Sequence, residues 1–220
     1  HVNVVGTAAV LAAARATGSN PKVLFVSSAE VYGTVRPEEL PLSEASELRP
    51  ATPYAASKAA AEQVALQCFR GFGQPVIVVR PFNHIGPGQA PVFAVPAMAK
   101  RMVEAVASGQ PAIKVGNLTA RRDFTDVRDV VRAYRLLITQ GEPGEIYNLA
   151  SGVDVGIDEV VSLLLAEVGA ELQTEVDPEL LRPVDIPVLR GDASKLKRAT
   201  GWVPELSLAD TVRDVVAALR

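Results

Sequence analysis

The sequence predicts an α/β fold with a doubly wound, mostly parallel sheet and a small C-terminal α/β lobe. Three short apolar runs, at 22–28 (KVLFVSS), 76–80 (VIVVR) and 146–150 (IYNLA), are typical of strands that are buried on both faces. Helical segments of 12 to 17 residues lie between and around these runs, and this alternation indicates βαβ units. The chain is 48% hydrophobic and 21% charged, which is sufficient for a buried core.

In the N-terminal half, the first element is a helix over residues 4–16, rich in Ala, Leu and Val. The sequence TGSNP follows it, and Gly followed by Pro ends helices. The strand at 22–28 comes next, and then a proline-rich loop over 33–53. A helix over 54–70 leads through Gln74 and Pro75 into the strand at 76–80.

The second half repeats the alternation with shorter elements. A loop over 81–91, rich in Pro and Gly, precedes a helix over 92–108, a short strand over 112–115 and a helix over 126–139. After the strand at 146–150, we expect an amphipathic helix over 157–168, a strand over 172–176, a loop at Arg182 and Pro183, and short helices over 194–199 and 208–219.

Composition excludes several classes of protein. With 220 residues the chain has room for one sizeable domain, or a domain with a small lobe. A net charge of −3 provides no basic field for nucleic acid or an anionic membrane. A single cysteine, Cys68, excludes a disulfide framework, and its apolar helical setting predicts a buried, inert thiol. The uncharged stretch 2–14 is too short to cross a bilayer, so we expect a soluble, cytoplasmic protein without a metal site.

Tyr54 and Lys58 are the first residues that indicate a chemical role. Positions i and i+4 of a helix share a face, so the two side chains project together. An ammonium beside a phenol favours the phenolate, and we therefore expect Lys58 to lower the pKa of Tyr54 from about 10 toward the working pH. Such a tyrosine can exchange a proton with a carbonyl or alcohol oxygen.

Ser28 stands at the carboxyl end of the first strand, the edge where parallel sheets bind ligands, and can hydrogen-bond the same oxygen. The alternative is a solvated Tyr–Lys pair beside a strand-end serine, since the spacing YxxxK is common by chance.

Longer motifs surround this pair. They are NVVGT at 3–7, SSAEVYG at 27–33, YAASK at 54–58, RPFNHIGPG at 80–88, RRDFTDV at 121–127, RPVDIP at 182–187, GDASK at 191–195 and TGW at 200–202. Together they make the chain resemble the extended short-chain dehydrogenases, a family of nucleotide-sugar epimerases, dehydratases and reductases, over essentially all of its length. The resemblance implies a Rossmann-like fold and NADP or NAD as the cofactor. Within the family, PFNHIGPGQ, RPVDIP and GDASKLKRATGW are most similar to reductases that convert GDP-4-keto-6-deoxy-mannose to GDP-rhamnose.

The resemblance assigns Ser28, Tyr54 and Lys58 as the catalytic triad. Tyr54 would protonate the C4 oxygen as hydride arrives, Ser28 would polarise the carbonyl, and Lys58 would hold both the tyrosine pKa and the nicotinamide ribose. It further implies that Asn3, Pro81 and His84 lie near the nicotinamide half of the cofactor.

The same resemblance implies four substrate contacts. Asn83 and Arg122 would hold the pyrophosphate of the sugar nucleotide, Arg182 would be a second clamp, and Asp185 would lie near the ribose hydroxyls. These residue types fit, because guanidinium groups bind phosphate bidentately. The alternatives are surface ion pairs for the two arginines, and turn residues for Asn83 and His84.

Three other polar or aromatic residues favour structural roles. Asp126 and Asp192 each precede a helix and are interpreted as caps. Trp202, after Gly201, is interpreted as a core anchor.

Glu30 leaves two reactions open. It lies two positions after Ser28, where the 4,6-dehydratases of the family carry a glutamate that removes the C5 proton. Those dehydratases have an arginine five positions after the histidine of their FNHE motif, whereas this chain has Ile85 directly after His84 and Gln89 at the fifth position. The comparison favours the reductase, with a dehydratase or 4-epimerase as the alternative.

No GxxGxxG motif follows a strand of this sequence, although the family begins with such a turn, where a helix N-terminus binds the dinucleotide pyrophosphate. By analogy we expect about one hundred residues of the family pattern to be missing. A non-catalytic nucleotide-sugar-binding fragment therefore stays open as an alternative to the enzyme.

We expect residues 1–90 and the returning segment 122–152 to form the remainder of the dinucleotide-binding domain. Residues 91–121 and 153–220 would form the nucleotide-sugar lobe.

The helices at 4–16 and 54–70 are rich in alanine, as at Ala8, Ala9, Ala59 and Ala60. Small residues allow close helix packing, and the resemblance implies a homodimer that pairs these two helices across a two-fold axis. Packing of the alanines against the chain's own sheet is the alternative.

Overall fold

A three-stranded parallel sheet with strand order β1-β2-β6 organises one half of the computed structural model, which describes residues 1–181 and 186–220. β1 spans Val23–Val26, β2 spans Val76–Pro81 and β6 spans Ile146–Leu149. β2 lies in the centre and is buried along its whole length, which explains its continuous apolar sequence.

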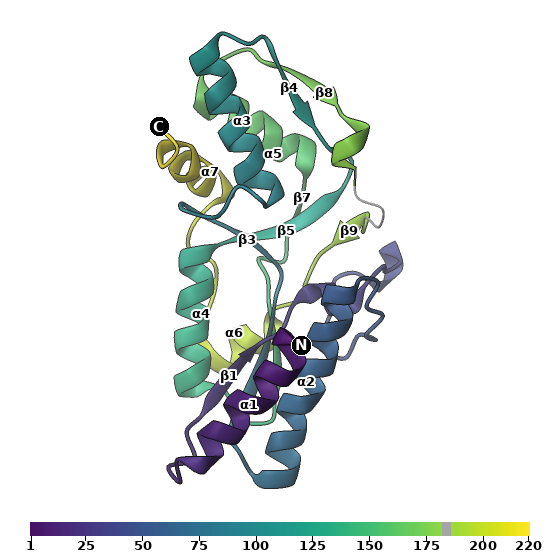
Figure 1. Ribbon diagram of the computed structural model, residues 1–220, viewed down its shortest axis with the longest axis vertical. Helices are drawn as coiled ribbons and strands as arrows, with labels where there is room; N and C mark the ends of the chain where they lie inside the picture. The colour runs from purple at the N-terminus through teal and green to yellow at the C-terminus, as the bar shows by residue number, and fades with distance from the viewer. Residues whose placement is uncertain (182–185) are drawn as a thin grey trace.

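Helices cover both faces of this sheet (Figure 1). α1 (Val2–Ala16) and α2 (Pro53–Phe72) pack side by side on one face, where Cys68 is buried as predicted. α4 (Val127–Gln140) covers the other face. Because side chains alternate along a strand, β1 contributes Val23 and Phe25 to the first core and Leu24 and Val26 to the second.

A second sheet crosses the middle of the molecule (Figure 1). Its central strand β5 (Arg121–Asp126) pairs in parallel with β3 (Asn83–Ile85) and β9 (Val188–Leu189), and antiparallel with β7 (Asp154–Gly156). The predicted loop over 81–91 therefore contains a strand. The hydrophobic pattern missed these strands because β3, β7 and β9 have only two or three residues and β5 is largely polar.

The remaining lobe packs three helices around one apolar core. These are α3 (Ala94–Ser108), α5 (Ile157–Val168) and α7 (Leu208–Ala217). A two-stranded parallel sheet of β4 (Ala112–Val115) and β8 (Gln173–Val176) flanks them. Within the described residues, no helix combines the length and the apolar character that are needed to cross a bilayer.

Short elements complete the chain. They are the 3-10 helices η1 (Ala29–Tyr32), η2 (Pro37–Glu39) and η3 (Pro178–Leu180), and the helix α6 (Ser194–Thr200). The predicted anchor is confirmed, because Trp202 is 1% exposed and its Nε1 donates to the Asp129 carbonyl at 3.0 Å. Asp126 caps α4 by accepting from the Arg128 amide, and Asp192 accepts from the Ser194 amide at the start of α6.

A buried ion pair joins α2 to the centre of the first sheet. The side chains of Arg80 and Glu62 are 3% and 0% exposed, and Arg80 donates to both carboxylate oxygens of Glu62. Arg80 also donates to the Tyr32 hydroxyl at 2.9 Å, which in turn donates to the Asn148 side chain at 2.6 Å. One guanidinium therefore connects α2, β2, η1 and β6.

We expect Glu62→Ala to lower the free energy of unfolding by about 3–5 kcal/mol, because it leaves the Arg80 charge buried and unpaired. Urea denaturation measures the change. The matched control is Glu104→Ala, which breaks an exposed pair with Lys100 and should cost under about 0.5 kcal/mol. The assignment would be contradicted if Glu62→Ala lowered the free energy of unfolding no more than the control does. It would also be contradicted if the double variant Glu62→Leu, Arg80→Met were less stable than each of the two single variants.

Candidate active site

Tyr54 and Lys58 lie in the first two turns of α2, beside the carboxyl end of β1. Pro53 occupies the first turn, and the Thr52 side chain caps the helix by accepting from the Ala55 amide at 3.1 Å. The ammonium of Lys58 donates to the Val26 carbonyl at 2.9 Å and lies 5.6 Å from the centre of the Phe25 ring. The lysine is thus tied to the last residue of β1.

Ser28 and Glu30 complete a cluster with these two residues. Ser28 is the second residue after β1 and has extended backbone, and its hydroxyl accepts from the Glu30 amide at 3.2 Å. Its side chain also hydrogen-bonds the Tyr54 phenol, which lowers the tyrosine pKa, while the Glu30 charge raises it. The fold therefore brings together all four predicted catalytic residues.

The protonation state of Tyr54 differs from the prediction. Burial is the main influence on this half-exposed phenol, and with the nearby Glu30 carboxylate it raises the pKa above the ordinary 10.0. Lys58 is not among the groups that shift this pKa; its ammonium donates to the Val26 carbonyl, and burial lowers the pKa of the lysine itself. The expected lowering of the Tyr54 pKa was wrong; with a pKa above 10.0, Tyr54 carries its proton at neutral pH.

A second phenol lies within electrostatic range. Tyr134 on α4 packs against the apolar core formed with Leu24 and Val26. Burial and the Tyr54 charge raise its pKa to about 12.

Three predicted cofactor contacts surround the cluster. The Asn3 amide donates to the Ser57 hydroxyl at 2.8 Å, which ties the start of α1 to the catalytic turn of α2. Pro81 is the buried last residue of β2. The half-buried His84 ring lies on β3 with its Nδ1 3.1 Å from the Phe82 carbonyl oxygen.

The second sheet holds the two described substrate candidates. Asn83 on β3 is exposed and pairs in register with Phe124, two residues after Arg122 on β5. The Arg122 guanidinium donates to the Arg121 carbonyl at 2.9 Å and to the Pro187 carbonyl at 3.5 Å. Arg182 and Asp185 lie outside the described residues.

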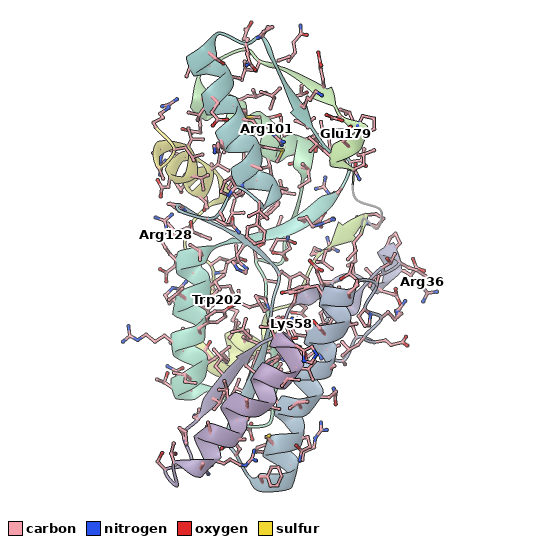
Figure 2. The ribbon with its side chains drawn as sticks, viewed as in Figure 1. Arg36, Lys58, Arg101, Arg128, Glu179 and Trp202 are labelled. Atoms are coloured by element: carbon pink, nitrogen blue, oxygen red, sulfur yellow. The ribbon has the colours of Figure 1, made fainter. Side chains whose placement is uncertain are left out.

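Arg101 was missed by the sequence analysis. It lies on α3, half-buried, and among the described residues nothing accepts a hydrogen bond from its buried Nε. Arginine stays charged at all relevant pH values, so this nitrogen is a donor that could bind an anionic group. The spacing of Arg101 in the sequence was a usable signal that it faces the interior. It stands three residues after Met98 and four before Ala105, so it shares a helix face with these two buried residues. Figure 2 shows Arg101 in the lobe beyond β5, away from Lys58.

A family model described as GDP-mannose 4,6 dehydratase matches residues 1–215. The chain is 38% identical over 219 residues to GDP-6-deoxy-D-mannose reductase of Pseudomonas aeruginosa, covering 99% of this chain and 72% of that protein. It is 27% identical to GDP-mannose 4,6-dehydratase of Vibrio cholerae, covering 99% of this chain and 66% of that protein. The chain thus spans about two thirds of the length of these relatives.

Solved structures share the fold. RMD from Pseudomonas aeruginosa, complexed with NADPH, matches with a TM-score of 0.93 and 37% identity, over 99% of this chain and 72% of that one. A UDP-glucose 4-epimerase from Thermus thermophilus in complex with NAD matches with a TM-score of 0.87 and 29% identity, over 99% and 70%. The predicted α/β class with parallel, Rossmann-like sheets is confirmed.

We expect Tyr54 to ionise above its ordinary pKa of 10.0, because burial and Glu30 both disfavour the phenolate. The absorbance of tyrosinate, followed with pH in the unmodified protein and in Tyr54→Phe, isolates this titration by difference. Glu30→Gln should move it to lower pH by removing the carboxylate. A Tyr54 titration near neutral pH would refute the assignment.

Proposed function

Because the chain belongs to the GDP-mannose 4,6-dehydratase family of NAD(P)-dependent nucleotide-sugar enzymes, we propose that it reduces the 4-keto group of GDP-4-keto-6-deoxy-mannose to give GDP-rhamnose. The observation that carries this proposal is the cluster of a protonated tyrosine, a serine and an anchored lysine at the end of β1. The 38% identity to a GDP-6-deoxy-D-mannose reductase supports the choice of substrate.

Carbonyl reduction adds a hydride to C4 and a proton to its oxygen, and NAD(P)H supplies the hydride when it is bound. Tyr54 donates the proton, and its raised pKa keeps that proton in place until the oxygen becomes basic. Ser28, which already hydrogen-bonds the Tyr54 phenol, donates to the same oxygen and stabilises its developing charge.

The residues around Tyr54 fit a nicotinamide ribose. Lys58 has three N–H donors, and the Val26 carbonyl takes one of them. The remaining donors can bind ribose hydroxyls. Asn3, Pro81 and His84 border the same strand ends, and we assign them to the cofactor side of the site.

Cationic and amide side chains fit the diphosphate of the substrate. Arg122 on β5 and Asn83 on β3 lie on neighbouring strands, and Arg101 adds a guanidinium nitrogen that still needs an acceptor. The same proposal retains Arg182 as a second clamp and Asp185 as a ligand of the ribose hydroxyls.

A 4,6-dehydratase is the second candidate, with a 4-epimerase as a related one. Glu30 favours the dehydratase, because its carboxylate is close enough to Tyr54 to raise the phenol pKa. A base at this position could remove a proton next to a keto group. Incubation with GDP-mannose distinguishes the reactions, since a dehydratase forms a 4-keto sugar without added reductant.

The assembly and division of the chain belong to the same proposal. We assign residues 1–90 with 122–152 to the dinucleotide-binding domain, and 91–121 with 153–220 to the nucleotide-sugar lobe. The outer side of α1 exposes Val2, Val5 and Val10, which supports a homodimer through α1 and α2; light scattering that finds a monomer at micromolar concentration would exclude it. A net charge of −3 supports a cytoplasmic protein without nucleic-acid or membrane partners.

In a protein that includes the family's glycine-rich segment, we expect Tyr54→Phe to lower kcat for keto-sugar reduction about 100-fold or more. The fold should be unchanged, because the tyrosine is half-exposed. Tyr147→Phe, on buried β6, is the matched control and should keep its turnover. Lys58→Met should weaken NADPH binding as well. Near-normal turnover of Tyr54→Phe would contradict the mechanism. A fragment without catalytic function would bind GDP-mannose but would not reduce GDP-4-keto-6-deoxy-mannose.

We expect Arg101→Met to lower the affinity for GDP-mannose about tenfold or more, the loss of a charge-assisted hydrogen bond. Stability should not fall, because the guanidinium Nε has no acceptor among the described residues. Calorimetric titration measures the affinity. The control is Arg135→Met, which replaces an exposed arginine on α4. Unchanged affinity would remove Arg101 from the site.

A further inference from the structure

Asp123 is a fully buried carboxylate on β5 that accepts four hydrogen bonds. One oxygen accepts from the Ser151 amide at 2.7 Å and the Ser151 hydroxyl at 2.6 Å. The other accepts from the Gly152 amide at 3.0 Å and the Gly191 amide at 3.2 Å. Its exposed fraction is 0%, so the carboxylate depends on these donors for its solvation.

The donors come from two separate segments. Ser151 and Gly152 follow β6 of the first sheet, and Gly191 follows β9 of the second. Gly191 is tightly enclosed, since a Cβ there would lie 2.5 Å from the Phe82 ring and 2.6 Å from the Ala150 side chain. The Asp123 carboxylate therefore holds the chain after β9 against the carboxyl end of the first sheet.

β9 in turn contacts Arg122. It pairs with β5 so that Leu189 lies opposite Arg122, and the Pro187 carbonyl accepts from the Arg121 amide at 2.8 Å. The same carbonyl lies 3.5 Å from the Arg122 guanidinium. Adjacent residues of a strand point to opposite faces, so Asp123 reaches Arg122 through β9 rather than directly.

We propose that Asp123 is a positioning residue that orients Arg122 toward the diphosphate of the sugar nucleotide by holding β9 in place. The inference rests on the proposed function, because it takes Arg122 as a diphosphate ligand. It adds a residue that touches neither substrate nor cofactor and acts on substrate affinity through the backbone.

Asp123→Asn tests the inference, because the amide keeps the shape but replaces an acceptor with a donor that faces backbone N–H groups. We expect GDP-mannose affinity, measured by calorimetry, to fall about tenfold. Hydrogen exchange should accelerate in peptides over 186–192 and stay unchanged in those over β1 and β2. Asp158→Asn, which alters an exposed carboxylate in the first turn of α5, is the matched control and should change neither quantity.

The double variant with Arg122→Ala separates positioning from general loosening. If Asp123 acts through Arg122, Asp123→Asn weakens binding in the original background and has no further effect once Arg122 is gone. Equal losses in both backgrounds would overturn the inference. If Asp123→Asn does not fold, Ser151→Ala removes one donor, and we expect about a threefold loss of affinity that again vanishes without Arg122.

The two proposals fail in different ways. Absence of GDP-mannose binding in the unmodified protein overturns the proposed function and this inference with it. Normal binding that Asp123→Asn leaves intact overturns this inference alone.

Discussion

The ion pair between Arg80 and Glu62 is the constraint on which the active site depends. Glu62 lies one helical turn after Lys58, which lies one turn after Tyr54, so the three side chains form a stripe along α2. Pairing Glu62 with the centre of the buried sheet sets the rotation and the height of the whole helix. The ammonium of Lys58 then meets the end of β1, and the phenol of Tyr54 stands beside Ser28.

Burial makes this arrangement both specific and costly. A bidentate, buried guanidinium–carboxylate pair tolerates little displacement, since any separation leaves a charge without water or a partner. The contacts of Arg80 extend the constraint to Tyr32 and Asn148. The strands and the helix that carry the catalytic groups therefore move as one unit.

The second sheet also contains a buried carboxylate, that of Asp123, but its hydrogen-bond partners differ in kind from those of Glu62. The Asp123 carboxylate is satisfied by backbone and hydroxyl donors rather than by a cation, while the guanidinium Nε of Arg101 lacks an acceptor among the described residues. Positive charge is thus left available on the lobe beyond β5. This uneven distribution of charge suits a ligand that carries negative charge at one end and the group to be reduced at the other.

The sequence by itself determined the strands with continuous apolar runs, the helices between them, and the pairing of Tyr54 with Lys58, because hydrophobic periodicity and i,i+4 spacing are local properties. Ser28 was indicated by its place at a strand end, and Glu30 by the family resemblance. The sequence also identified the Asp126 cap and the buried Trp202. Only the tertiary structure decided the strands β3, β5, β7 and β9, which are too short or too polar to carry a periodic signal. The same holds for the charge state of Tyr54, since its pKa depends on burial and on the charged and polar groups that the fold brings near the phenol. The roles of Arg80, Arg101 and Asp123 likewise follow from groups that are distant in sequence and meet only in the folded chain.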